Sequence, residues 1–241
     1  MPKAIIVGAT SGIGKEVALQ LLAKGWEVGI AGRRTERLEE IKAKAPEKIR
    51  IRRIDVRSDD AASDLLALIA DLGGMDLYVH CSGIGCQNTE LNPDAELNIV
   101  ATNVDGFFGL LTALSPTFWK RRRTSVHHQF DCRHERPRSC KCLLRLKAFQ
   151  NTYLDALEQL SVMRKCPMTF TDVRPGFVDT DLLADGKSYP FKMNVSDVAS
   201  SIVKGIETKK RVLVIDWKYK LLVFFWRLVP QCLWKYFPIK S

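Results

Sequence analysis

Short apolar runs alternate along the first part of the chain with segments whose apolar residues recur every three or four positions. The runs predict buried strands, and the helical spacing between them, as at Val17, Ala18, Leu21 and Leu22, predicts amphipathic helices. We expect strands at residues 3–7, 27–31, 50–56 and 75–81, with helices at 14–24, 36–45 and 59–72. The rhythm resumes later, with helices at 148–163 and 195–206 and strands at 168–173 and 211–215.

Strands that alternate with helices predict right-handed crossovers and a parallel sheet covered on both faces. The pattern therefore predicts an α/β fold built on a single doubly wound parallel sheet. We expect residues 1–208 to form the main domain, and residues 209–241 to add a last strand and a basic, aromatic tail.

The turn after the first predicted strand is rich in glycine and reads Gly8-Ala9-Thr10-Ser11-Gly12-Ile13-Gly14. Glycines there let the backbone turn tightly and approach a pyrophosphate, which then rests on the helix N-terminus. The second predicted strand ends in Arg33-Arg34, where an NAD site of this kind carries an acid for the ribose. Two guanidiniums suit a 2′-phosphate, so the sequence favours NADP over NAD, the alternative being solvated arginines that open a helix.

Composition adds a charge anomaly. A chain of 241 residues with 46% hydrophobic and 27% charged residues is typical of a globular protein and excludes disorder or collagen, yet the net charge is +10. Residues 120–147 and 209–241 carry the whole excess, so the remainder is mildly acidic and no nucleic-acid partner is expected. Seven irregularly spaced cysteines and the lack of a signal peptide favour a reducing cytoplasm, and no apolar run of about 18 residues predicts a membrane span.

Five motifs, in order along the chain, resemble the classical short-chain dehydrogenase/reductase family, whose fold is of the Rossmann type. They are the Gly-rich turn, Asp55-Val56, a degraded Asn-Asn-Ala-Gly at His80-Cys81-Ser82-Gly83, Asn103-Val104-Asp105-Gly106, and Pro175-Gly176-Phe177-Val178-Asp179-Thr180. The resemblance covers residues 1–119 and 148–215. It implies that the cofactor is held by Gly8, Thr10, Ser11, Gly12, Ile13, Gly14, Arg33, Arg34, Asp55, Val56, Cys81, Gly83, Lys147, Pro175, Gly176, Val178 and Thr180.

The same resemblance implies hydride transfer between NADP and a small-molecule alcohol or ketone. A Tyr acts as general acid/base in the family, and a Lys four residues later lowers its pKa and holds the nicotinamide ribose. A Ser thirteen residues before the Tyr binds the substrate oxygen, and an Asn positions a water. Of these four, Asn103 and Lys147 are present here. We also expect a homo-oligomer, and no metal site.

The Ser and the Tyr are missing, because Phe130 and Leu143 stand at their positions. The surrounding window, residues 121–142, is rich in Arg, His, Cys and Pro where the fold needs an apolar fifth strand. Synonymous codons for residues 127–146, read one base later, can encode a strand-five motif followed by Tyr-x-x-x-Lys at the family's spacing. We hypothesise an inserted base near Lys120 and a compensating deletion near Lys147. The rival interpretations are a zinc module at Cys132, His134, Cys140 and Cys142, and a catalytically inactive NADP-binding or scaffold protein.

The C-terminal tail interleaves aromatic and basic residues, among them Trp217, Trp226, Arg227 and Trp234. Such a segment suits peripheral contact with the inner surface of a membrane, or packing on a partner subunit or over the substrate pocket. Both interpretations stay open at the level of the sequence.

Overall fold

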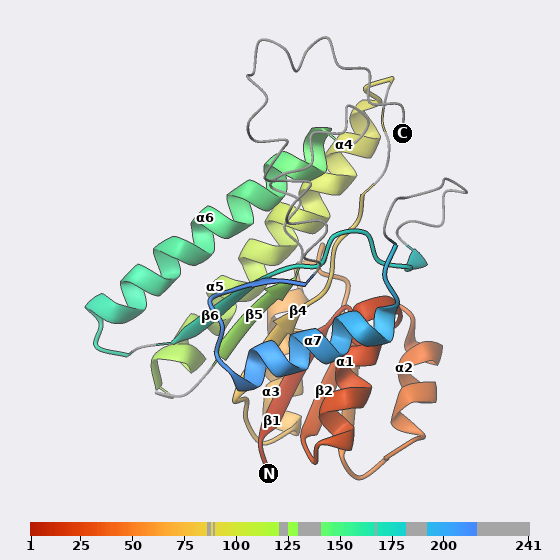
Figure 1. Cartoon of the computed structure of the whole chain (residues 1–241), viewed down its shortest axis with the longest axis vertical. Coiled ribbons are helices and arrows are strands. Elements are labelled where there is room, and N and C mark those ends of the chain that lie inside the picture. The colour runs from red at the N-terminus through yellow and green to blue at the C-terminus, as the bar shows by residue number, and fades with distance from the viewer. Residues whose placement is uncertain are drawn as a thin grey trace.

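A parallel sheet forms the centre of the protein (Figure 1). The computed structural model describes residues 1–85, 88, 90–120, 125–129, 141–166, 168–181 and 192–215, and only the backbone of residues 118–120, 125–129 and 141–145. The described part contains seven strands: β1 (Lys3–Val7), β2 (Glu27–Gly32), β3 (Ile49–Arg53), β4 (Leu77–His80), β5 (Ser125–Gln129), β6 (Thr169–Arg174) and β7 (Val212–Val214).

The strand order is β3-β2-β1-β4-β5-β6-β7, and every neighbouring pair is parallel. This confirms the predicted doubly wound α/β fold. The order reverses between β1 and β4, and open sheets of this kind bind ligands outside the carboxyl ends of the strands at such a reversal. The topology therefore marks where a site should lie.

Helices cover both faces of the sheet (Figure 1). They are α1 (Gly12–Ala23), α2 (Thr35–Lys42), α3 (Ala61–Asp71), α4 (Pro93–Val100), a π-helical turn η1 (Ala101–Asp105), α5 (Gly106–Lys120), α6 (Lys141–Met163) and α7 (Val195–Glu207). Helices α1 and α7 pack together over one face, and α3, α5 and α6 lie over the other.

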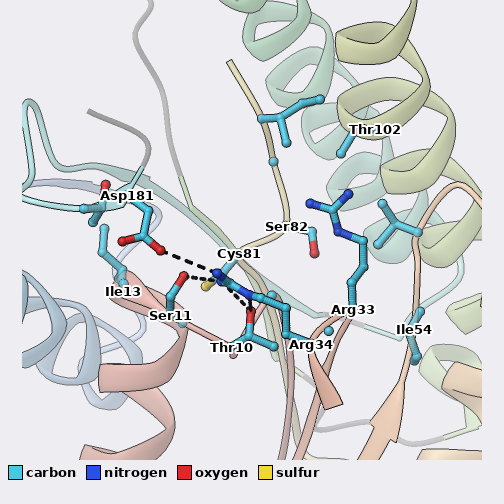
Figure 2. Close-up of a pocket in the computed structure, with 18 of the residues that line it drawn as sticks. Thr10, Ser11, Ile13, Arg33, Arg34, Ile54, Cys81, Ser82, Thr102 and Asp181 are labelled. Atoms are coloured by element: carbon cyan, nitrogen blue, oxygen red, sulfur yellow. Dashed lines mark hydrogen bonds and ion pairs between the residues drawn. The ribbon is translucent and has the colours of Figure 1, made fainter. Parts of the chain in front are cut away.

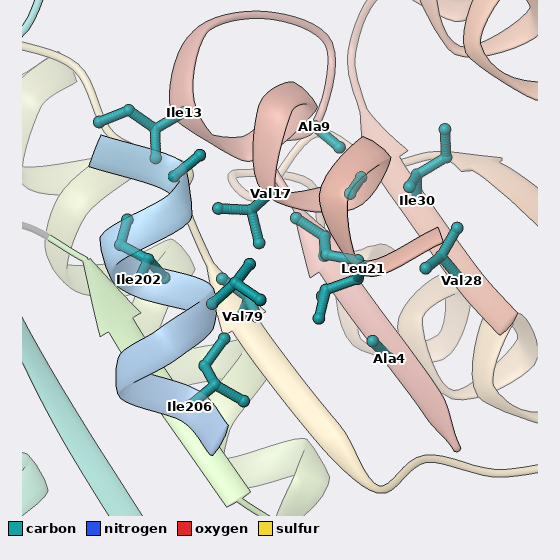
Figure 3. Close-up of a cluster of buried hydrophobic side chains, with 14 of the residues drawn as sticks. Ala4, Ala9, Ile13, Val17, Leu21, Val28, Ile30, Val79, Ile202 and Ile206 are labelled. Atoms are coloured by element: carbon teal, nitrogen blue, oxygen red, sulfur yellow. The ribbon is translucent and has the colours of Figure 1, made fainter. Parts of the chain in front are cut away.

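The two faces of the sheet belong to separate apolar cores because successive side chains of a strand point in opposite directions. In β1, Ala4 and Ile6 join the core under α1 and α7, whereas Ile5 and Val7 join the core under α3 and α5. Figure 3 shows the first of these cores, where side chains of α1 and α7 meet those of the central strands. Burial on both faces explains why the strands are continuous apolar runs in the sequence.

The fifth strand corrects one expectation. The basic window was expected to lack this strand, but Ser125–Gln129 pairs in parallel with β4 on one side and with β6 on the other. Strand pairing uses main-chain N–H and C=O groups, which every residue other than proline provides. A gap here would leave the facing edges of β4 and β6 without partners, so the position between them favours a strand whatever its side chains.

The helical run through α4, η1 and α5 was not predicted from the sequence. Within the described residues, Pro93–Thr117 is a stretch long and apolar enough to cross a membrane, with a mean hydropathy of 1.4, which departs from the expectation that no such stretch exists. A core helix of a soluble protein passes the same test, and 44% of this window is buried inside the protein. Its packing against α3 and α6 accounts for much of its apolar character.

Candidate functional site: a pocket at the sheet reversal

A cavity of about 610 Å³ opens at the carboxyl ends of β1, β2 and β4, where the strand order reverses (Figure 2). It brings together thirteen of the residues predicted to hold a cofactor: Gly8, Thr10, Ser11, Gly12, Ile13, Gly14, Arg33, Arg34, Asp55, Val56, Cys81, Gly83 and Thr180. The lining also includes residues that were not predicted: Gly32, Ile54, Ser82, Ile84, Thr102 and Asp181.

The glycine turn closes tightly against its neighbours. Gly8 has a φ of +90°, and its N–H donates to the carbonyl oxygen of Ala31 at 2.9 Å. A Cβ added to Gly14 would lie 2.4 Å from the carbonyl oxygen of Gly8, and one added to Gly8 would lie 2.6 Å from the backbone of Cys81. Glycine is therefore required at both positions for α1 to sit this close to β1 and β4.

The N-terminus of α1 faces this pocket. The first N–H groups of a helix lack intrahelical partners and carry a partial positive charge, so they bind anions. Ser11 occupies the N-cap position, but its side chain makes no capping hydrogen bond, and the first turn contains no acidic residue. The end of α1 is thus suited to receive an anionic ligand such as a pyrophosphate.

Arg34 extends across the pocket from the start of α2. Its Nη2 donates to Thr10 Oγ1 at 2.9 Å and to Ser11 Oγ at 2.7 Å, and its Nε donates to Thr10 Oγ1 at 3.3 Å. Figure 2 shows that Arg33 points elsewhere, towards Ser82 and Thr102, so the two guanidiniums that the sequence placed together diverge. The guanidinium of Arg34 lies against the glycine turn, through its hydrogen bonds to Thr10 and Ser11.

Asp181 closes an ion-pair cluster that the sequence analysis missed. Its Oδ2 lies 3.6 Å from Arg34 Nη1 and 3.5 Å from Arg37 Nη1. Arg34 is the N-cap residue of α2 and Arg37 lies in the first turn of that helix. A third arginine so close to Arg33 and Arg34 is the signal that could have identified Arg37. The position of Asp181 could not be read from the sequence, because it reaches α2 only through the tertiary fold.

Asp55 lines the other end of the pocket and is held by Arg57. Arg57 Nη2 donates to Asp55 Oδ2 at 2.8 Å, and Arg57 Nε donates to Oδ1 at 3.1 Å. These hydrogen bonds to Arg57 lower the pKa of Asp55 to about 2, and the charge of Arg33 contributes to the same shift. Arg57 also donates to Asn98 Oδ1 at 2.9 Å, which ties this carboxylate to α4.

Asn103 is fully buried in the π-helical turn and fastens the loop after β4. Its Nδ2 donates to the carbonyl oxygens of Ile84 at 2.7 Å and Ile99 at 3.0 Å, and its Oδ1 accepts from the N–H of Ile84 at 3.3 Å. Turns of this type commonly occur at functional sites. The amide of Asn103 pairs with both the N–H and the C=O of Ile84, as the main chain of a neighbouring strand would. Because Ile84 lines the pocket, Asn103 fixes this end of it.

Lys147 lies on α6 beside this turn and is 4% exposed. A Cβ added to Gly83 would lie 2.8 Å from Asn103 Oδ1 and 3.7 Å from Lys147 Nζ, so the two predicted catalytic residues meet at Gly83. Gln150, one turn along α6, donates from Nε2 to the main-chain oxygen of Asn103 at 2.6 Å. Gln150 was not predicted, and it joins the helix that carries Lys147 to the turn that carries Asn103.

Two buried groups at the end of β4 stay neutral. Burial, together with the nearby charge of Lys147, lowers the pKa of His80 to about 3. Tyr78 Oη and His80 Nδ1 lie 2.9 Å apart within the core. Burial raises the pKa of Cys81 to about 12, and the charge of Lys147 acts in the opposite direction. Neither His80 nor Cys81 is ionised near neutral pH, so the cationic chemistry at this end belongs to Lys147.

Five predicted residues lie outside the cavity lining: Asn103, Lys147, Pro175, Gly176 and Val178. Pro175 and Gly176 form the turn after β6, and Val178 is a core residue that pairs with Met193. Phe130 and most of the basic window, and the tail after residue 215, lie outside the described residues, as do the side chains of Cys142 and Leu143. Among the described residues, no group of three His, Cys, Asp or Glu side chains is placed to hold a metal ion.

Comparison with known proteins identifies the family. Residues 2–126 match the family model described as short chain dehydrogenase. An uncharacterized oxidoreductase of Myxococcus xanthus is 28% identical over 236 residues, which cover 95% of this chain and 92% of the relative.

Solved structures share the fold at lower identity. A 3-ketoacyl-(acyl-carrier-protein) reductase from Brucella melitensis, complexed with NADH, has a TM-score of 0.79 and 21% identity, with 89% of this chain and 96% of that chain covered. A short-chain dehydrogenase from Sphingobium yanoikuyae, in complex with NADPH, has a TM-score of 0.80 and 14% identity, with 96% and 97% covered. The chain belongs to the short-chain dehydrogenase family and is of the oxidoreductase class.

Proposed function

We propose that the protein is an oxidoreductase that binds NADP in preference to NAD and transfers hydride between the nicotinamide and a small alcohol or ketone. The observation that carries the proposal is the pocket at the sheet reversal, where the glycine turn, the N-terminus of α1 and Arg34 converge. Family membership and relatives that bind NADH or NADPH support a nicotinamide dinucleotide.

The residues present fit such a cofactor. The crowding around Gly8 and Gly14 leaves the backbone of the turn bare of side chains, so a pyrophosphate has room against the N-terminus of α1. Asp55 and Val56 line the opposite part of the cavity, which suits the adenine end of the dinucleotide. The preference for NADP rests on Arg34 and Arg37, whose guanidiniums lie 3.6 Å and 3.5 Å from one carboxylate oxygen and so mark an anion position.

The bound dinucleotide would supply the hydride donor or acceptor. Lys147 would stabilise negative charge next to the reacting oxygen, since a buried ammonium acts strongly in a low dielectric. Asn103 would fix the floor beside Lys147 through its three hydrogen bonds to Ile84 and Ile99. Gln150 would hold the distance between these two residues through its bond to the main-chain oxygen of Asn103.

The two positions where the family carries its Ser and Tyr hold no group that could move a proton in this chain. Phe130 and Leu143 carry no polar atom in their side chains, and we propose that a shifted reading frame over residues 127–146 replaced a Ser and a Tyr at these positions. General acid/base groups contribute about 10²–10⁴-fold to a rate. This chain should therefore bind the cofactor and turn over slowly.

The test compares two proteins for NADPH-dependent reduction of a panel of aldehydes and ketones. One is this chain, and the other carries the segment encoded by the shifted frame at residues 127–146. We expect the second to be faster by two orders of magnitude or more. A matched control carries the same restored segment with Phe at position 143, which keeps the packing and removes the phenol oxygen. Equal turnover by this chain and the restored chain would refute the frame hypothesis, as would codons of the gene that do not encode the shifted text.

The alternative is an NADP-binding or scaffold protein without catalytic activity. The proposed oxidoreductase and this alternative share the same cofactor site, so a measurement of cofactor binding does not distinguish them. Failure of the restored chain to reduce any member of the panel while it binds NADPH would favour the alternative.

We also propose a homo-oligomer that forms through α5 and α6. Phe108 and Phe149 are 42% and 41% exposed, and both contact Tyr153, with ring centroids 4.9 Å and 6.3 Å apart. Exposed aromatic clusters of this kind mark protein interfaces.

We further propose a cytoplasmic location, with peripheral membrane contact through residues 216–241. The test compares the binding of the full chain to anionic vesicles with that of a chain ending at residue 215.

A further inference from the structure

We propose that Asp181 determines how strongly the site selects NADP over NAD. Its carboxylate occupies the anion position between Arg34 and Arg37 that the 2′-phosphate of NADP would take. NADP must then displace Asp181, whereas NAD binds with the carboxylate in place. This inference rests on the proposed dinucleotide site and adds an internal competitor to it.

The guanidiniums of Arg34 and Arg37 together define a position for an anion. Arg34 extends from the N-cap of α2 and Arg37 from its first turn, and both reach the same oxygen, Asp181 Oδ2 (Figure 2 shows the Arg34 contact). Two guanidiniums around one anionic oxygen form the arrangement that also binds a phosphate, because both anions present acceptor oxygens to N–H donors. A carboxylate and a 2′-phosphate cannot occupy the same position at once.

The hydroxyl groups of the glycine turn keep Arg34 in place. Its Nε and Nη2 donate to Thr10 Oγ1 and Ser11 Oγ, which leaves Nη1 directed at Asp181. The guanidinium is thus already positioned for an anion, and only its partner has to change. Asp181 lines the cavity directly after Thr180, so it lies beside the cofactor's path.

The exposure of the three side chains sets the size of the effect. Asp181 is 70% exposed, Arg34 43% and Arg37 46%, so water and salt screen both ion pairs. The competitor is therefore weak and can be displaced by a doubly charged phosphate. Removing it should raise the affinity for NADP about two- to fivefold, because the binding-competent fraction rises by that factor.

A neighbouring carboxylate provides a matched control. Asp179 precedes Asp181 by two residues and is 68% exposed, but its Oδ1 lies 2.6 Å from Lys192 Nζ and not beside the arginines. Asp179→Asn removes the same unit of charge from the same segment. Any general effect of charge on anion binding should therefore be equal in Asp179→Asn and Asp181→Asn.

The experiment measures Kd values of NADPH and NADH for the wild-type chain, Asp181→Asn and Asp179→Asn by calorimetry, at low and high salt. We expect Asp181→Asn to bind NADPH two to five times more tightly, with NADH unchanged, Asp179→Asn like the wild type, and the difference reduced at high salt. An unchanged NADPH affinity in Asp181→Asn, an equal gain for NADH, or the same gain in Asp179→Asn would overturn the inference.

The same data test the proposed function separately. A wild-type chain that binds NADH as tightly as NADPH contradicts the proposed cofactor preference, whereas the inference about Asp181 depends only on the difference between the variants. An NADPH-specific gain in Asp181→Asn upholds the inference even in that case.

Discussion

Asn103→Ala removes the side chain that holds the floor of the proposed active site. The amide makes three hydrogen bonds, two to the main chain of Ile84 and one to Ile99, and it is fully buried. A buried hydrogen bond contributes about 0.5–1.5 kcal/mol net, so the three together correspond to about 3 kcal/mol. In a chain of this size each kcal/mol shifts the Tm by about 2–4 °C, which predicts a loss of roughly 6–12 °C.

Asn151→Ala is the matched control for this measurement. Asn151 is also buried, at 2% exposed, and within the described part of the chain neither atom of its amide has a hydrogen-bond partner. Both substitutions remove the same atoms from a buried position, so their difference isolates the hydrogen bonds of Asn103. Urea unfolding of the two variants should differ by about 3 kcal/mol. Equal stabilities would refute the claim that Asn103 fastens the loop after β4.

Three further predictions follow from the site and its surroundings. Gly14→Ala should weaken NADPH binding more than tenfold, because the new Cβ would lie 2.4 Å from a backbone oxygen, whereas Gly109→Ala, with nothing within 4 Å, should bind normally; equal binding by the two variants in a fluorescence titration would contradict the packing argument. The pKa of Asp55 is lowered from 3.8 to about 2 on folding, so its ion pair stabilises the protein fully above pH 3.8, and this stability is lost as the pH falls through about 2. In urea unfolding, Asp55→Asn should therefore destabilise the protein at pH 5 and have little effect at pH 2. An effect independent of pH would exclude the ion pair as its cause. Phe149→Asp should shift the protein to monomer in light scattering, and an unchanged mass would rule out α5 and α6 as the interface.

The order of the elements could be predicted because burial on both faces leaves its mark on the sequence. The apolar runs gave β1, β2 and β4 to within two residues at either end, and the glycine turn located the start of α1. The run through α4, η1 and α5 was missed because residues 107–114 are almost continuously apolar, and such a run shows no clear helical periodicity. The fifth strand was missed for a physical reason: main-chain pairing between β4 and β6 does not depend on the apolar side chains that signal a strand.

Some residues of the candidate site could also be predicted from the sequence, and others could not. Residues of the glycine turn were predictable because their chemistry depends on local backbone geometry. Asp181 and Gln150 were not predictable, because each acts on a residue that only the tertiary fold brings near it. Arg57 lies two residues from Asp55, so that ion pair could have been predicted from the spacing. The pairing of Arg33 with Arg34 assumed that adjacent residues point to one ligand, but the two side chains leave the backbone in different directions.

We infer above all that this chain keeps an intact dinucleotide site even though the Ser and Tyr of the family are absent from it. The most direct measurement is a calorimetric titration of the purified chain with NADPH and, in parallel, with NADH. We expect saturable binding at one site per chain, tighter for NADPH than for NADH. Absence of saturable binding by a folded chain, with either dinucleotide, would contradict it.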